Sequence, residues 1–331
     1  MDPSSEVVVE LPIFRIYKDL HVERLSGTET VPAGADAKTG VVSKDVVIDG
    51  DAGVYVRLYL PVPDTPATTW ATDGGPTKLR VLIFFHGGGF ITESAASPVY
   101  HSYLNSLAAA ARVLVVSVNY RLAPEHPFSV GYDDSLRALR WALSGGEGDP
   151  WLSRHGDLRR VFLAGDSAGG NIVHNVAMMA AAAAAEEGSD GVAAAARIEG
   201  AVLLHAAFAG KEPVAGEAAE VAAMMDTLWS VICPESAAAA GVDDPRMNPL
   251  AAAAPSLREL PFERLLVVEA DGDFFRGRGR AYYEGVVASG WGGKVEWFES
   301  VGKEHVFFLL DPGCPEALAL MDRLVAFFAG N

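Results

Sequence analysis

The sequence is poor in cysteine and in basic residues. Its 331 residues include 2 cysteines, Cys233 and Cys314, which lie far apart and form no Cys-x-x-Cys pair. This spacing offers neither a disulfide framework nor a zinc ligand set, and it is typical of a protein from a reducing compartment. The chain has 26 lysines and arginines against 43 acidic residues, a formal net charge of -17. Such a balance argues against nucleic acid and anionic membranes as partners.

Long apolar segments are also missing. The N-terminal region carries charges throughout, and its longest apolar run, Val7 to Val9, is too short for the core of a secretory signal. The most apolar tract, Val176 to Ala185, stops at Glu186 and Glu187 before it reaches membrane-spanning length. We therefore expect a soluble protein of the cytoplasm, with the nucleus as a further compartment.

Three motifs of other chemistries are absent: His-Glu-x-x-His, the phosphate-binding Gly-x-x-x-x-Gly-Lys, and a Gly-x-Gly-x-x-Gly that follows a strand. His21, His101, His126, His155 and His174 are scattered without ligand spacing, and His174 is expected to pack inside a helix. The sequence thus predicts neither a metal nor a cofactor.

Buried strands and helices alternate from Leu79 onward, which predicts an α/β fold with a mainly parallel sheet and helices on both faces. Strands are expected at 80–85, 114–119, 161–164, 200–204, 264–269 and 294–298, and helices at 100–111, 132–143, 171–186, 282–288 and 316–328. Before them, two β-rich runs at 41–48 and 54–60 flank Asp49-Gly50-Asp51-Ala52-Gly53, a hairpin signal, and a short helix is expected near 12–18.

Residues 210–260 break the alternation, because they are alanine-rich, apolar and interrupted by prolines at 234, 245, 249 and 255. An apolar insertion between two strands is expected to cap the C-terminal edge of the sheet. We therefore predict a helical cap from two parts, an N-terminal segment at 1–40 and an insertion at 210–260. The core is expected at 41–209 and 261–331.

Gly165-Asp166-Ser167-Ala168-Gly169 stands between the apolar run Val161 to Ala164 and a long helix-forming segment. A strand that turns tightly into a helix places the central serine at the tip of a strained elbow. Ser167 is therefore the candidate nucleophile. Asp166 must then point away from the site, and we expect it to hold a neighbouring loop.

His86-Gly87-Gly88-Gly89-Phe90 follows the strand that ends at Phe85. Consecutive glycines allow backbone N–H groups to converge on one point, as an oxyanion requires. We assign this oxyanion hole to the N–H groups of Gly88, Gly89 and Ala168. His86 itself is expected to support the loop.

A serine nucleophile needs a neighbouring base. After an elbow of this kind the chain order is serine, then acid, then histidine, which places the base on a late loop. His305 lies in the loop after the strand at 294–298 and is the candidate base, whereas His205 is expected to be a packed residue at a strand end. Asp271 and Asp273 both follow the strand at 264–269, and spacing alone does not separate them as the acid that orients the imidazole.

Together these motifs resemble the α/β-hydrolase fold, specifically the hormone-sensitive-lipase-like group and its plant carboxylesterases. The resemblance covers nearly the whole chain. Its landmarks are Phe14-Arg15-Ile16-Tyr17-Lys18, Asn119-Tyr120-Arg121-Leu122-Ala123-Pro124-Glu125-His126, Asp244-Pro245-Arg246-Met247-Asn248-Pro249-Leu250 and Arg278-Gly279-Arg280-Ala281-Tyr282-Tyr283. It implies that Asp273 is the acid, although Gly277 replaces an acidic residue that is frequent in the group.

The resemblance also implies a serine carboxylesterase that acts on a small to medium hydrophobic ester, as a monomer or homodimer. Phe14, Met224, Met225 and Trp229 would line the apolar substrate pocket or only pack the cap. Two relatives provide alternatives. Gibberellin receptors resemble esterases that lost the catalytic histidine, whereas His305 is present here; hydroxyisoflavanone dehydratases are too similar for motifs to exclude.

Overall fold

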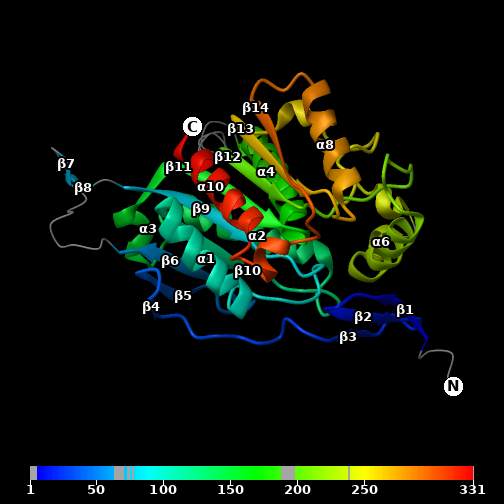
Figure 1. Cartoon of the computed structure of the whole chain (residues 1–331), viewed down its shortest axis with the longest axis horizontal. Helices are drawn as coiled ribbons and strands as arrows, with labels where there is room; N and C mark the ends of the chain where they lie inside the picture. Colours follow the sequence, from blue (N-terminus) through cyan, green and yellow to red (C-terminus); the bar gives the residue numbers. More distant parts are fainter. Residues whose placement is uncertain are drawn as a thin grey trace.

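A computed structural model describes residues 6–62, 71–72, 75–76, 78–187, 198–237 and 239–330. At its centre is a nine-stranded sheet with the order β14-β13-β12-β11-β9-β10-β6-β5-β4 (Figure 1). The strands are β4 (Ala35–Asp36), β5 (Val41–Asp49), β6 (Val54–Pro61), β9 (Leu79–Phe85), β10 (Val113–Asn119), β11 (Gly156–Asp166), β12 (Ile198–Leu204), β13 (Arg264–Ala270) and β14 (Lys294–Ser300). From β10 to β14 all neighbours pair in parallel, which confirms the predicted fold class.

The central strands are apolar throughout because helices cover both of their faces. In β9, Val81, Ile83 and Phe85 pack into one core, and Leu82 and Phe84 point into the other. Helices α2 (Phe128–Leu143), α4 (Ala168–Glu187) and α8 (Arg276–Ala288) contribute to the first core, and α1 (Pro98–Ala111) and α10 (Pro315–Ala329) contribute to the second (Figure 1). The predicted hairpin is confirmed as the antiparallel pair β5 and β6.

The predicted helix near 12–18 is wrong, since this segment forms strand β2 (Phe14–Tyr17) between β1 (Val7–Glu10) and β3 (Val22–Arg24). Phe14 and Ile16 are fully buried and alternate with partly exposed neighbours, which is the period of a strand. Pairing with β1 and β3 satisfies the backbone of this short segment. It lies beside α6 (Ala219–Ile232) at one end of the sheet (Figure 1).

The remaining elements are short: β7 (Ala71–Thr72), β8 (Gly75–Pro76), α3 (Pro150–His155), α7 (Pro234–Ala237), η2 (Gly241–Asp243), η3 (Leu257–Glu259) and α9 (Phe307–Leu310). The domain boundaries at 40, 209 and 260 stay a prediction.

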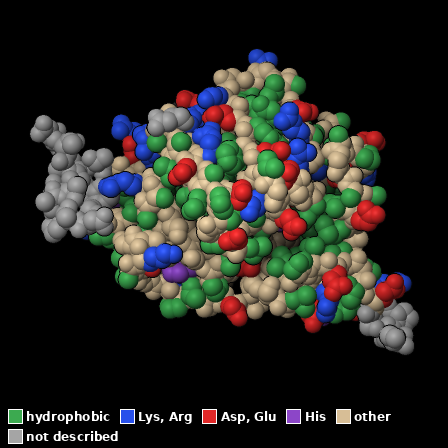
Figure 2. Space-filling model, in the orientation of Figure 1, with side chains coloured by type: hydrophobic (Ala, Val, Ile, Leu, Met, Phe, Trp, Pro, Cys, Tyr) green, Lys and Arg blue, Asp and Glu red, His purple; other side chains and the backbone are tan. Residues whose placement is uncertain are grey.

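Acidic and basic side chains are interspersed over the face shown in Figure 2. None of the described helices combines the length and the apolar character that a membrane crossing requires.

Candidate active site

The elbow is built by steric demands on its glycines. Ser167 stands between β11 and α4 with φ 52, a left-handed conformation that a non-glycine residue keeps only where its surroundings enforce it. A Cβ on Gly169 would lie 2.0 Å from the carbonyl oxygen of Phe85, and one on Gly165 would lie 2.5 Å from the backbone of Gly169. Only glycine therefore fits on either side of Ser167, as the motif predicts.

The loops after β13 and β14 bring an imidazole and a carboxylate to this serine. His305 Nε2 lies 3.0 Å from Ser167 Oγ, and His305 Nδ1 lies 2.7 Å from Asp273 Oδ2. Ser167 is 9% exposed, and the His305 side chain is 18% exposed. The geometry therefore joins hydroxyl, imidazole and carboxylate in one chain of hydrogen bonds that solvent reaches at its imidazole.

The two aspartates that spacing could not separate occupy different environments. Asp271 is exposed and accepts the N–H groups of Gly302 and Lys303 at 2.6 and 3.3 Å. Asp273 is buried, and its Oδ1 accepts the N–H of Phe275 at 2.7 Å. Burial alone would raise the pKa of Asp273, but the facing imidazoles lower it below the usual aspartate range. Asp273 is thus the acid that contacts His305.

The glycine loop after β9 turns sharply beside the elbow. Gly88 and Gly89 have φ values of 96 and 62, and a Cβ on Gly88 would lie 2.2 Å from the Thr92 carbonyl oxygen. Within the described ranges no hydrogen bond uses the N–H of Gly88, Gly89 or Ala168. These three amides are consequently available to a ligand, as an oxyanion hole requires.

A family model described as "alpha/beta hydrolase fold" matches residues 82–309. The chain is 44% identical to tuliposide A-converting enzyme 2 of Tulipa gesneriana, over 99% of this chain and 80% of that one. It is 39% identical to probable carboxylesterase 2 of Arabidopsis thaliana, over 98% of this chain and 97% of that one.

The chain belongs to the α/β-hydrolase family.

Solved structures of hydrolases agree with this placement. An esterase of Pyrobaculum calidifontis is 25% identical, with a TM-score of 0.65 over 87% of this chain and 84% of that one. The esterase LipW of Mycobacterium marinum is 25% identical, with a TM-score of 0.67 over 89% of this chain and 83% of that one.

In this hydrolase Asp166 and His86 support the glycine loop, as expected from the sequence. Asp166 Oδ2 accepts the hydroxyl of Tyr100 at 2.8 Å, and that hydroxyl accepts the N–H of Gly87 at 2.8 Å. Burial raises the pKa of Asp166 to about 7. The His86 ring lies 2.8 Å from the carbonyl oxygen of Gly87 and stacks on Tyr120, and burial lowers its pKa to about 4. His174 packs against Tyr282 inside the core.

The four candidate pocket residues lie around the same loop and cap helix. Phe14 is fully buried, and a Cβ on Gly89 would lie 2.7 Å from its ring. Met225 and Trp229 are buried in α6, and Met224 is partly exposed. The Trp229 ring packs edge-on against Phe128. Phe14 thus contacts the glycine loop directly, and a substrate contact for each of the four stays a prediction.

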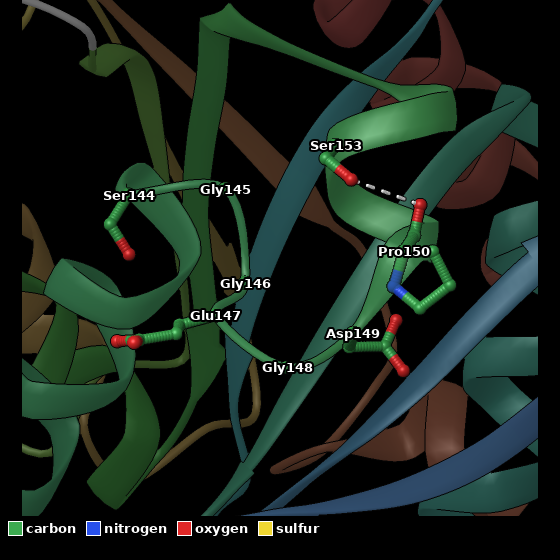
Figure 3. A pocket seen from close by; sticks show the side chains of 8 residues that line it. All are labelled: Ser144, Gly145, Gly146, Glu147, Gly148, Asp149, Pro150 and Ser153. Carbon is green, nitrogen blue, oxygen red and sulfur yellow. Dashed lines mark hydrogen bonds between the residues drawn. The ribbon is translucent and has the colours of Figure 1, made fainter.

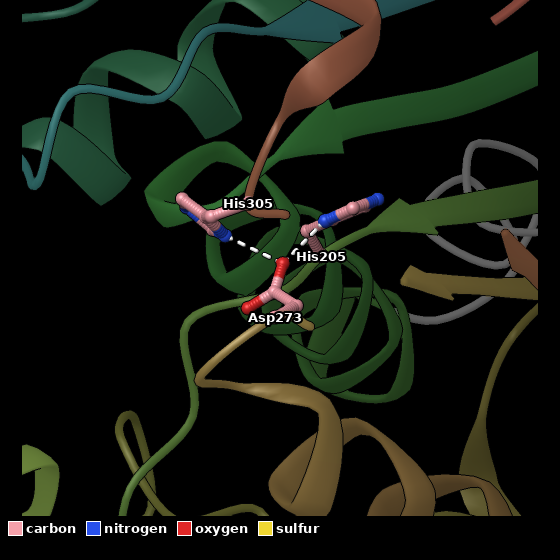
Figure 4. Close-up of side chains that lie close together, drawn as sticks. All are labelled: His205, Asp273 and His305. Atoms are coloured by element: carbon pink, nitrogen blue, oxygen red, sulfur yellow. Dashed lines mark hydrogen bonds and ion pairs between the residues drawn. The ribbon is translucent and has the colours of Figure 1, made fainter. Parts of the chain in front are cut away.

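The structure adds one residue to the site, His205 at the end of β12 (Figure 4). It is buried as expected, but its Nδ1 also hydrogen-bonds Asp273 Oδ2, the oxygen that His305 uses. Ligand atoms of His205, Asp273 and His305 lie within 4.8 Å of one another, a spacing that a metal site shares. Its position at the carboxyl end of a central strand was the signal in the sequence, since neighbouring strand ends supply Ser167 and Asp273.

A surface hollow of about 580 Å³ lies elsewhere on this hydrolase (Figure 3). Its lining is the glycine-rich connection from α2 to α3, with Glu147 and Asp149. That connection leads into the amino-terminal end of β11, whereas Ser167 follows its carboxyl end. The hollow is therefore separate from the candidate site.

Proposed function

We propose that this carboxylesterase hydrolyses small to medium hydrophobic esters through Ser167, His305 and Asp273. The observation that carries the proposal is the single imidazole of His305, hydrogen-bonded to the serine hydroxyl through Nε2 and to the buried carboxylate through Nδ1. A hydroxyl is a weak nucleophile near neutral pH, so it requires a base held in this position. Relatives named carboxylesterases and esterase structures support the activity.

In the acylation step Ser167 Oγ attacks the ester carbonyl as His305 Nε2 accepts the hydroxyl proton. The carbonyl oxygen becomes an oxyanion, which the N–H groups of Gly88, Gly89 and Ala168 stabilise. Asp273 holds the Nδ1 proton of His305 and stabilises the imidazolium. The C–O bond to the alcohol then breaks, and His305 gives its proton to the leaving oxygen.

In the deacylation step water attacks the acyl group on Ser167, and His305 Nε2 accepts a proton from that water. The oxyanion forms in the same place and collapses to release the carboxylic acid. His305 returns the proton to Ser167 Oγ. The cycle needs no cofactor, since each proton is held by His305 between steps.

The hydrophobic substrate class rests on two apolar side chains: Phe14, which contacts the glycine loop, and Trp229 in the cap helix α6, which packs against Phe128. A hormone receptor would not need a serine activated by His305, so the hydrogen bond between them disfavours that alternative. A dehydratase reaction would use a different substrate, a hydroxyisoflavanone, and release of the dehydrated product would identify it.

Turnover of p-nitrophenyl butyrate by the wild type and by Ser167→Ala tests the proposal. We expect kcat/KM to fall by roughly a thousandfold or more, because the acyl-enzyme cannot form. Equal thermal unfolding curves for the two proteins would exclude a folding defect. Equal hydrolysis rates would contradict the proposal.

We also propose the cytoplasm as the compartment, because two distant cysteines without Cys-x-x-Cys spacing are typical of a reducing compartment. The tulip relative is named chloroplastic, and a third relative, probable carboxylesterase 4 of Arabidopsis thaliana, is named mitochondrial. The location of a C-terminal fluorescent fusion decides between these compartments. Size-exclusion chromatography with light scattering decides between monomer and homodimer.

A further inference from the structure

His205 lies in a strained turn that is hydrogen-bonded to both β13 and the elbow. Its φ of 51 is left-handed, although it carries a full side chain. Its backbone N–H donates to the Val268 carbonyl oxygen at 2.8 Å, which ties it to β13, the strand that leads to Asp273. The turn that contains it also receives the elbow, since Ser167 N–H donates to the Leu204 carbonyl oxygen at 2.9 Å. The strained turn thus fixes the ring relative to both Ser167 and Asp273.

The ring of His205 faces the carboxylate. Asp273 Oδ2 has two lone pairs, and the Nδ1 atoms of His205 and His305 both reach it (Figure 4). An ionised carboxylate only accepts hydrogen bonds, so the His205 proton lies on Nδ1 and points at Asp273. The amide nitrogen of Val306 also lies 3.3 Å from this Nδ1. A protonated Nδ1 has no free lone pair, so this contact adds no hydrogen bond in that tautomer.

We propose that His205 is a positioning residue, a permanently neutral N–H donor that shares the charge of Asp273 and so tunes the proton affinity of the His305–Asp273 pair. This inference rests on the proposed role of Ser167, His305 and Asp273. One negative charge faces two imidazoles, and only one of them can usefully take the proton during turnover. Full burial of His205 favours its neutral form, whereas His305 is reached by solvent.

The other charged groups near this cluster do not replace His205. Burial and the neighbouring Asp273 raise the pKa of Glu269 well above its usual range, which disfavours its charged form. Burial lowers the pKa of His205 against the opposing effect of Asp273. The groups that face the cluster in the described part of the chain are Asp273 and Glu269 from β13 and its loop, His305 from the loop after β14, and Asp166 from β11.

Two amide variants test the donor. In His205→Asn the side-chain NH₂ takes the place of Nδ1 and keeps a donor to Asp273, whereas in His205→Gln it takes the place of Nε2. We expect His205→Gln to lower kcat/KM for p-nitrophenyl butyrate about tenfold. With one donor fewer, the pair binds a proton more tightly, so the acid limb of the pH profile moves up by roughly half a unit to one unit.

His205→Asn should restore the wild-type acid limb and most of the activity. His174→Gln, a second buried histidine that bonds Tyr282 instead of Asp273, is the matched control and should leave the acid limb unchanged. Identical acid limbs in His205→Gln, His205→Asn and the wild type would overturn the inference. An inactive wild type would instead remove the proposed function, so the two failures are distinguishable.

The bond can also be observed without activity, in case His205→Gln does not fold. In protein labelled with ¹⁵N-histidine, two imidazole N–H protons should resonate at low field, one from each bond to Asp273. His205→Asn should remove one of them and keep the other. A single low-field signal that survives in His205→Asn would overturn the inference, because Asp273 would then have one imidazole partner.

Discussion

The elbow at Ser167 and the N-terminal segment β1 to β3 both lie against the glycine loop, but they are held there in different ways. Backbone atoms hold the elbow: Gly169 packs on the Phe85 carbonyl, and the Ser167 carbonyl accepts the N–H of Ala207 at 2.9 Å. Side chains hold the N-terminal segment, chiefly Arg24, which donates to the carbonyl oxygens of Ile91 and Ala123. We therefore expect a rigid elbow beneath a cap that yields more easily.

The largest effect should come from substitution of Asp273, the acid beside the rigid elbow. Asp273→Asn keeps the shape but presents an amide to His305, which favours the wrong tautomer, so kcat should fall by about four orders of magnitude. Asp271→Asn is the matched control, since Asp271 is exposed and the hydrogen bonds of its carboxylate in the described ranges come from the amides of Gly302 and Lys303. Its kcat should stay within about twofold of the wild type. Similar losses of kcat in both variants would mean that burial does not decide which aspartate orients His305.

Glycine substitutions compare a crowded position in the elbow, Gly169, with an open position outside it, Gly34. Gly169→Ala places a methyl group 2.0 Å from a backbone oxygen, which cannot move aside without disturbing β9. We expect the free energy of unfolding to fall by about 3 kcal/mol or more. Gly34→Ala, where a Cβ would meet nothing within 4 Å, should change it by less than about 0.5 kcal/mol. Chemical denaturation measures both changes, and equal changes would contradict the steric requirement for glycine in the elbow.

The buried carboxyl group beneath the glycine loop gives stability a pH dependence. Burial raises the pKa of Asp166 to about 7 from an unfolded value of 3.8, so the folded state binds the extra proton between these values. The contribution of Asp166 to stability is therefore present below pH 3.8 and is lost as the pH rises towards 7. Asp166→Asn should gain a few kcal/mol relative to the wild type between pH 4 and pH 8.

Thermal unfolding at the two pH values checks this prediction. Asp311→Asn, at an exposed aspartate, is the control and should follow the wild type at both. If the stability difference between Asp166→Asn and the wild type were the same at pH 4 and pH 8, Asp166 would not titrate in this range.

The smallest effect should come from the tether of the N-terminal segment. The Arg24 guanidinium also pairs with Glu125, but the side chains are 24% and 56% exposed, so the ion pair itself contributes little. Arg24→Ala should raise KM about twofold to fivefold at nearly constant kcat, because substrate must order a looser cap. Arg15→Ala is the control, since Arg15 pairs with Glu10 and Glu23 inside the segment. An equal change of KM in both variants would contradict the role of Arg24 in holding the N-terminal segment.

The two regions also differ in how well their structure could be predicted from the sequence. The elbow and the glycine loop were predicted because their glycines are required by contacts close in sequence or in neighbouring strands. The strand Phe14–Tyr17 was mistaken for a helix because its pairing with β1 and β3 decides the conformation of so short a segment.

The site shows the same limit. Asp271 and Asp273 follow one strand, and their spacing does not tell them apart. The family resemblance implied Asp273, and in the structure its burial against His305 and His205 distinguishes it from Asp271. His205 was expected only to pack, because nothing in its local sequence reveals that a left-handed turn aims its ring at Asp273. Side-chain direction at a strand end depends on a backbone angle that the sequence pattern does not determine.

The most direct test of the central claim is the reaction of the wild type with a fluorophosphonate, followed by peptide mass spectrometry. We predict one modification per chain, on the peptide that contains Ser167, and a large loss of labelling rate in Asp273→Asn. No modification of Ser167 in active protein, or modification that is equally fast in Asp273→Asn, would contradict the claim that Asp273 and His305 activate this serine.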